Sequence, residues 1–295
     1  MLMFGQVVIS GIMMGGIYAL ISIGLTLIFG VTRIVNFAHG EYVMLSMFAS
    51  FMFFERLGWD PYFSVIPIAI LAFVAGCLTQ RIIIQPLLDA SHASQIFVTL
   101  GLSITLMNVA LMVWGADFQS VRTIYEGAVV YLGPWSIGVP RLVTFLVAVA
   151  MMVALLLFLN RTYMGRAITA VSQDRMAAVL MGIDVKWVYI MSFGIGIALV
   201  GVAGAVLTPI YSVFPTVGQY FGMAAYVVVV LGGMGSVIGA MVGGLIIGVV
   251  EALSGYYISP SLKEAVYFVI FIVVLVVRPS GLLGIAGSEE MGTKL

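Results

Sequence analysis

Charged residues are scarce in this sequence of 295 residues. Asp, Glu, Lys and Arg together account for 8% of it, whereas an ordinary soluble domain contains about 25%. Hydrophobic residues account for 63%, and the mean hydropathy is +1.22. A soluble globule of this size has no interior large enough to hide so much apolar surface. The lipid bilayer is therefore the expected solvent, and the chain is predicted to be an integral membrane protein.

Other scarcities exclude further classes of protein. The 12 basic and 12 acidic residues cancel, so the chain offers neither a basic face for nucleic acid nor an acidic tail. The single cysteine, Cys77, excludes an internal disulfide, and His39 and His92 are too few for a histidine-rich metal site. Residues 1–6 carry no basic side chain, so no cleavable signal peptide is expected and the first apolar stretch is predicted to stay as a membrane span.

Motifs of hydrolytic enzymes are also missing. A P-loop requires Gly-Lys followed by Ser or Thr, but the residues after Lys186, Lys263 and Lys294 are Trp, Glu and Leu. The sequence contains neither His-Glu-x-x-His nor Gly-x-Ser-x-Gly. We therefore expect a transport protein rather than an enzyme, with no cofactor of its own. Any step driven by ATP needs ATPase subunits on other chains.

The chain consists instead of a series of charge-free apolar windows. A helix that crosses the roughly 30 Å hydrocarbon core needs about 20 mostly apolar residues. The windows are 1–32, 42–54, 61–80, 90–116, 142–160, 187–250 and 265–277. They predict an all-α fold, a polytopic transmembrane helical bundle of eight to nine spans with broken or re-entrant segments. Residues 1–295 are expected to form this single transmembrane domain.

The distribution of basic residues predicts the orientation. The loop 161–186 is the richest in them, so it is placed in the cytoplasm, and alternation then puts the N-terminus outside. Its basic residues are Arg161, Arg166, Arg175 and Lys186. Arg278 and Lys294 favour a cytoplasmic C-terminus. An outside start and an inside end require an odd number of crossings, which favours nine spans, or eight with an asymmetric re-entrant element.

A polar run separates the first two windows, and it reads Arg33-Ile-Val-Asn-Phe-Ala-His-Gly-Glu41. It is either a cytoplasmic turn or a break that draws polar groups into the membrane edge. The window 42–54 is too short to span alone, so its helix must begin at about Ala38, which supports the second interpretation. Broken helices line transport sites because their free backbone groups bind substrates or ions. The candidate pathway residues here are Asn36, Phe37, His39, Gly40 and Glu41.

A second break occurs at Leu231-Gly-Gly-Met-Gly-Ser236, where each of three glycines costs a helix about 1 kcal/mol relative to alanine. It is either a packing turn or a discontinuous helix that faces the pathway, with Ser236 capping the next half-helix. Paired interruptions in the two halves of a chain are typical of transport sites. Gly232, Gly233, Gly235 and Ser236 are therefore further candidate pathway residues.

The basic loop contains apolar residues at near-helical spacing between Gly165 and Gly182. They predict one short amphipathic helix, which Gly182 ends, and Asp184 is placed to cap the following span. Such a helix either lies on the membrane surface or docks into a groove on another protein. Composition favours neither alternative.

Together these three segments resemble the branched-chain amino-acid ABC permeases of the LivH type. The run from Val31 to Glu41 is the specific part of the resemblance. The segment from Met164 to Ile183 is similar to that family's coupling loop, and Val230 to Gly248 is similar to its late glycine-rich element. The blocks occur in the family's order, and the resemblance covers nearly the whole chain.

The resemblance implies an ABC importer subunit of the inner membrane that translocates branched-chain or other neutral amino acids. Its implied partners are a second, related permease, two cytoplasmic ABC ATPases and an extracytoplasmic solute-binding protein. The residues implied to couple ATP hydrolysis to transport are Gly165, Arg166, Asp174, Met181, Gly182 and Ile183. The resemblance does not distinguish a homodimer of permeases from a heterodimer.

Two alternative functions stay open. Urea and short-chain amide permeases have a nearly identical polar run, so this run does not fix the substrate. An ion-coupled secondary carrier needs carboxylates within the membrane, and the candidates are Glu41 and Glu251.

Overall fold

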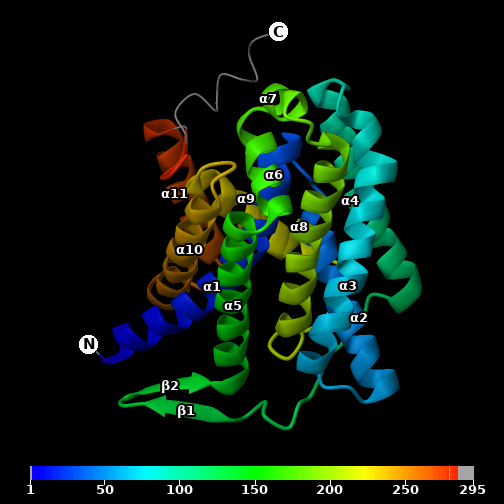
Figure 1. Ribbon diagram of the computed structural model, residues 1–295. Coiled ribbons are helices and arrows are strands. Elements are labelled where there is room, and N and C mark those ends of the chain that lie inside the picture. The colour runs from blue at the N-terminus through cyan, green and yellow to red at the C-terminus, as the bar shows by residue number, and fades with distance from the viewer. Residues whose placement is uncertain (1, 279, 285–295) are drawn as a thin grey trace.

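The computed structural model describes residues 2–278 and 280–284, and Figure 1 shows its bundle of helices. In chain order the elements are α1 (Leu2–Thr32), α2 (His39–Leu57), α3 (Pro61–Thr79), the π turn η1 (Gln80–Ile84), the 3₁₀ turn η2 (Gln85–Leu87), α4 (His92–Trp114), β1 (Val129–Leu132), β2 (Trp135–Gly138), α5 (Val139–Arg161), α6 (Tyr163–Gln173), α7 (Arg175–Leu180), α8 (Val185–Leu207), α9 (Val217–Gly232), α10 (Val237–Tyr257) and α11 (Lys263–Val277). The predicted helical bundle is confirmed, with one short hairpin added. Lys294, which favours a cytoplasmic C-terminus, lies outside the described residues.

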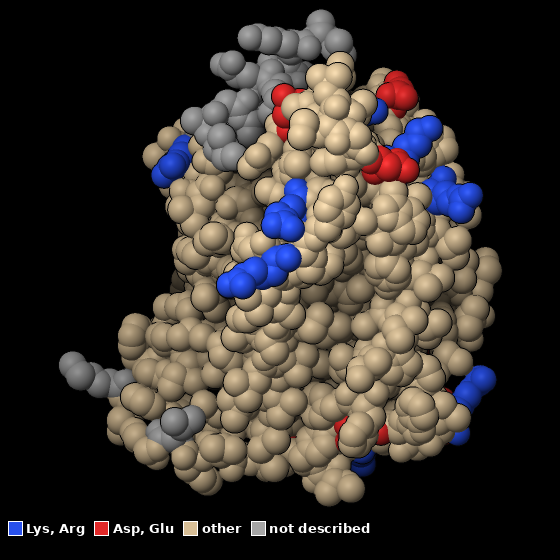
Figure 2. All heavy atoms as spheres, in the orientation of Figure 1, with Lys and Arg blue, Asp and Glu red and all other residues tan. Residues whose placement is uncertain are grey.

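Among the described residues, six helices are long and apolar enough to cross a membrane. They are Leu2–Thr32, Pro61–Leu87, His92–Trp114, Val139–Arg161, Val185–Leu207 and Val237–Tyr257. The helices α2, α9 and α11 fall short of these limits of length or composition, so the predicted eight to nine spans are not confirmed. On the face shown in Figure 2, charged side chains lie in the upper half and at the lower end of the molecule, with an uncharged zone between them.

The helices α1 and α8 form the centre of the bundle. Residues 15–28 of α1 are all buried, and most of α8 is buried as well. The helices α5, α9 and α10 pack around α1, α3 packs along α8, and α2 packs against α8 and α9. The outer helices α3, α4 and α5 expose large apolar side chains, among them Ile66, Phe97, Met112 and Leu146. Lipid or partner subunits must cover this apolar surface.

Glycines allow α1 and α10 to approach each other closely. A Cβ added at Gly15 would lie 2.8 Å from the Gly244 carbonyl oxygen, which leaves no room for a side chain. Gly11 faces Val249 near one end of the pair, and Gly30 faces Gly235 near the other. The two helices are therefore antiparallel, and small residues bring their backbones into contact as they do in many membrane helix pairs.

The connection between α4 and α5 is tied to the bundle at several points. Gln119 forms an isolated bridge with Val213 through two backbone hydrogen bonds of 2.9 and 2.7 Å. The Tyr125 hydroxyl donates to Asp60 Oδ1 and Oδ2 at 2.7 Å, and Asp60 also caps α3 by accepting from the Tyr62 amide at 2.9 Å. Burial and the nearby Asp60 carboxylate raise the pKa of Tyr125, so the phenol keeps the proton that it donates.

Candidate translocation and coupling sites

The polar run after α1 re-enters the bundle. The helix ends at Thr32, and Arg33 has a left-handed backbone conformation (φ 59°), which turns the chain back. Residues 33–36 have no regular structure, and α2 begins at His39. The His39 Nε2 atom lies 3.0 Å from the Ile21 carbonyl oxygen, in the buried central stretch of α1. The predicted start of this helix at about Ala38 is therefore confirmed to within one residue.

The re-entrant run buries polar groups that lack partners. Asn36, His39 and Glu41 are buried, yet Asn36 Nδ2, His39 Nδ1 and Glu41 Oε2 have no hydrogen-bond partner among the described residues. The other atoms are bonded: Ser103 Oγ donates to Glu41 Oε1 at 3.1 Å, and the Ala38 amide donates to Asn36 Oδ1 at 3.2 Å. An unpaired buried polar group costs about 1–3 kcal/mol. Three of them within six residues mark a segment that is not optimised for stability.

A second helix begins beside the first. Gly40, at the start of α2, touches Gly218 at the start of α9, and a Cβ on Gly40 would overlap the Gly218 carbonyl oxygen. Glu41 Oε2 also faces Gly218, which places a carboxylate at the positive end of α9. Phe37 is half-buried and packs against Tyr226 of α9, with ring centroids 5.5 Å apart. Two helix N-termini therefore meet inside the bundle.

The glycine-rich break lies at the opposite end of α9. Gly232 packs against Gly239, Gly235 faces Gly30 at the end of α1, and Gly233 packs against Gly284. Ser236 caps α10 by accepting from the Gly239 amide at 3.0 Å, as the sequence predicts. The two predicted breaks are therefore not brought together. They are joined through α9, which begins at the first break and ends at the second.

The basic loop forms two helices, so the prediction of one short helix is wrong. Asp174 separates α6 from α7, because its side chain accepts from the Ala177 amide at 2.9 Å and starts a new helix. Gly182 follows α7 with φ +79°, a left-handed conformation that suits glycine. Asp184 then caps α8 by accepting from the Trp187 amide at 3.2 Å. The predicted stop at Gly182 and cap at Asp184 are confirmed.

The candidate coupling residues lie on and beside these two helices. Gly165 is buried against Phe158 and Leu159, Ile183 is partly buried, and Arg166, Asp174 and Gly182 are exposed. Next to them α7 presents an apolar surface, in which Met176, Leu180 and Met181 are 73%, 85% and 82% exposed. Exposed apolar patches at the polar end of a membrane protein are typical of surfaces that bind another protein.

A contact that the sequence does not reveal joins these two regions. The Arg33 guanidinium donates from Nη2 to the Ser172 carbonyl oxygen at 3.0 Å, which links the re-entrant run to the last turn of α6. The sequence separation of 139 residues gives no signal for this pair. This hydrogen bond connects α6 directly to the segment that precedes α2.

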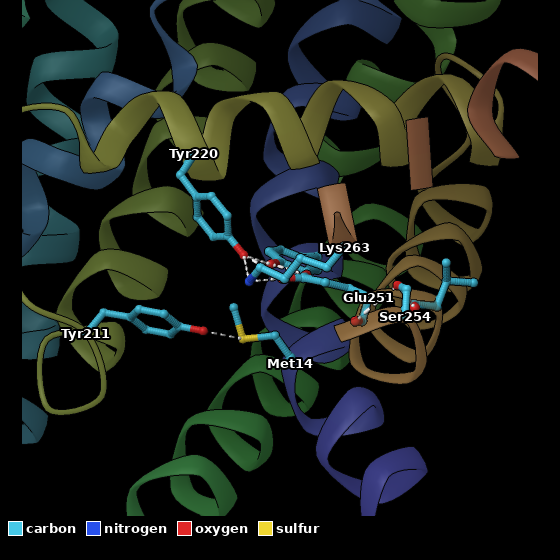
Figure 3. A network of polar contacts seen from close by, with 8 residues as sticks. Met14, Tyr211, Tyr220, Glu251, Ser254 and Lys263 are labelled. Carbon is cyan, nitrogen blue, oxygen red and sulfur yellow. Dashed lines mark hydrogen bonds and ion pairs between the residues drawn. The ribbon is translucent and has the colours of Figure 1, made fainter. Parts of the chain in front are cut away.

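A polar network lies on another side of α1 (Figure 3). Glu251 of α10 accepts from Tyr220 at 2.6 Å and from Tyr18 at 2.5 Å, and it forms an ion pair of 2.6 Å with Lys263. The sequence shows Glu251 only as a carboxylate in an apolar run near Lys263. The tyrosines could not be assigned to it, because they come from α1 and α9 and only the packing of these helices on α10 brings them together.

These features define a multi-pass helical membrane protein in which two helices begin inside the bundle and an apolar surface is exposed at one end. A family model described as "Branched-chain amino acid transport system / permease component" matches residues 7–275, and the chain belongs to this family.

Curated relatives agree with this family. The chain is 35% identical to the high-affinity branched-chain amino acid transport system permease protein LivH of Salmonella typhimurium, over 96% of each chain. It is 32% identical to the corresponding protein BraD of Pseudomonas aeruginosa, over 95% of each chain. A more distant relative, the fructose import permease protein FrcC of Rhizobium meliloti, is 28% identical over 73% of this chain and 61% of its own length. No solved structure matches the chain.

Proposed function

We propose that this chain is a membrane-spanning subunit of an ABC importer and that it translocates branched-chain amino acids across the inner membrane. The observation that carries the proposal is the 35% identity to LivH over 96% of both chains. An alignment that spans both proteins includes the re-entrant run, the loop 161–186 and the glycine-rich break, so it covers every segment to which a transport role is assigned.

The arrangement of helices supports nine crossings. The helix α1 runs inward from an external N-terminus, α2 completes an outward crossing after the re-entrant run, and α9 returns inward from its start beside Gly40. The remaining helices alternate in direction, so α11 ends in the cytoplasm. The contacts of Gly30 with Gly235 and of Gln119 with Val213 fit this order, because they pair segments on the same side.

The candidate pathway residues follow from the meeting of α2 and α9. Asn36, His39 and Glu41 carry the unpaired polar atoms, and Gly40 provides the close contact that allows α9 to slide or tilt against α2. In the described structure these groups are buried within one subunit. These polar groups reach a substrate only when α9 moves. The C-terminal end of α9 leads to the second break, at Gly232, Gly233, Gly235 and Ser236.

The partners follow from what the chain lacks and what it exposes. One of the two cytoplasmic ABC ATPases docks on α6 and α7 beside Arg166 and Met181. A second related permease covers part of the exposed apolar flank and binds the other ATPase, and a solute-binding protein delivers the substrate outside. The Arg33 contact with Ser172 then carries the movement of the ATPases to the re-entrant run.

Replacing Arg33 with alanine should uncouple this importer. The substitution removes the hydrogen bond between the docking helices and the re-entrant run but leaves α7 intact. We expect the assembled transporter in proteoliposomes to keep hydrolysing ATP while leucine uptake per ATP falls about tenfold, as for the loss of one charge-assisted hydrogen bond. Arg122→Ala, which changes an exposed arginine of the connection between α4 and α5, is the matched control. An unchanged ratio of uptake to ATP hydrolysis in Arg33→Ala would refute the proposed linkage.

A further inference from the structure

A cavity of about 210 Å³ lies between α1, α10 and the start of α5. An apolar cavity of about 150 Å³ holds a benzene molecule, so this one has room for a molecule of the size of leucine. Part of its wall is apolar, formed by Met13, Met14, Ile17, Ile210 and Ala252. Methionine side chains adapt to the shape of a ligand. The remaining wall includes Arg141, Tyr211, Glu251 and Lys263.

The charged groups of the cavity do not cancel. Among the described residues, the one ion pair joins Lys263 to Glu251, so the guanidinium of Arg141 contributes a positive charge without an anionic partner. Within the described part of the chain, the Tyr211 hydroxyl donates only to the Met14 sulfur, at 3.4 Å, and a thioether is a weak acceptor. A cation and an underused hydroxyl that line the same cavity form a suitable site for a carboxylate.

The Glu251 network has one position left for a cation. A carboxylate has about four acceptor positions, and Glu251 uses three of them, for Tyr18, Tyr220 and Lys263. The ammonium group of Lys263 likewise donates to Glu251 and Tyr220, which leaves one of its three N–H groups. Figure 3 shows Tyr220, Glu251 and Lys263 together with Tyr211 and Met14. The cavity therefore offers donors for a carboxylate, one acceptor for an ammonium group, and an apolar wall.

We infer that this cavity is a transient binding site for a zwitterionic α-amino acid with an apolar side chain. Arg141 and Tyr211 hold the carboxylate, Glu251 accepts from the ammonium group, and the methionines surround the side chain. The inference rests on the proposed function and extends it. The cavity places the substrate on the external side of the re-entrant run and provides charge-selective contacts to the substrate. Urea and short-chain amides have no carboxylate to engage Arg141.

The test uses a single cysteine as a reporter. In the assembled transporter Cys77→Ser removes the native cysteine, whose Sγ donates to the Ile190 carbonyl oxygen, a bond that serine also makes. Ser10→Cys then introduces a nearly isosteric thiol at the cavity. The rate at which a small thiol reagent labels this cysteine is measured without ATP or solute-binding protein. Leucine and leucinamide are compared, since leucinamide keeps the ammonium group and side chain but lacks the carboxylate.

We expect leucine to slow the labelling at a concentration about 10-fold to 100-fold lower than leucinamide, and Arg141→Gln to remove this difference. Arg122→Gln, which lies outside the cavity, should retain it. The inference is overturned if leucine and leucinamide slow the labelling equally, or if neither slows it. It is also overturned if the labelling slows only when an anionic lipid is present, whether or not leucine is added. Leucine uptake by the transporter without these changes is measured in parallel. If the unaltered transporter takes up no leucine, the result refutes the proposed function rather than the proposed binding site.

Discussion

Replacing Gly40 with valine is expected to abolish leucine uptake by the importer. The side chain would occupy the space of the Gly218 carbonyl oxygen and push the starts of α2 and α9 apart. Because the obstructing atom belongs to the backbone, no side-chain rotation can relieve the overlap. Overpacking of this kind costs about 1–3 kcal/mol in a packed interior, and here it also displaces Glu41 from the end of α9.

The effect on uptake must be separated from a failure to fold. The amount of transporter in the membrane and its thermal unfolding temperature are measured together with uptake. Gly101→Val is the control, because Gly101 lies in the membrane helix α4 with open space around the position of an added Cβ. The Gly101→Val variant carries the same cost of a β-branched residue in a helix as Gly40→Val. If Gly40→Val transports leucine as well as Gly101→Val does, the contact between α2 and α9 is not required for transport.

Replacing Leu180 with glutamate is expected to detach the ATPase subunits. Leu180 is 85% exposed on α7, so the substitution creates no cavity and no buried charge in the chain itself. At the proposed docking surface it removes about 1.5–3 kcal/mol of apolar burial and places a carboxylate against an apolar groove. The affinity for the ATPases should fall at least about 100-fold.

Co-purification of the ATPase subunits with the tagged permease measures this loss. Ile124→Glu introduces the same charge at a fully exposed isoleucine of the connection between α4 and α5, which the proposed topology places outside. The control should keep the ATPases bound and the uptake normal. If the Leu180→Glu variant keeps the ATPases bound and the Ile124→Glu variant loses them, the orientation proposed for the whole chain is reversed.

The sequence predicts most of the fold because local rules decide it. The apolar windows give the helices, and the caps at Ser236 and Asp184 and the stop at Gly182 follow from side chains that bond to neighbouring backbone groups. The start of α2 was predictable because window 42–54 is too short to span without extra residues. Asp174 misleads, since the same capping rule breaks the expected helix in two.

Contacts between distant segments account for the rest. The pairing of Gly40 with Gly218, the bond from Arg33 to Ser172 and the network of Glu251 each join helices far apart in the sequence. A lone arginine or tyrosine in an apolar run gives no indication of its partner. The role of the candidate pathway residues stays a prediction for the same reason, because it depends on a movement of α9 rather than on one arrangement.

The central claim is the substrate, and uptake by intact cells tests it most directly. Labelled leucine and labelled urea are offered to cells with and without this gene, at matched expression of the other transporter subunits. The account predicts that deletion of the gene removes high-affinity leucine uptake and leaves urea uptake unchanged. Returning the unaltered gene should restore leucine uptake. Loss of urea uptake with normal leucine uptake would contradict the account and assign the chain to the amide-transporting branch of its family.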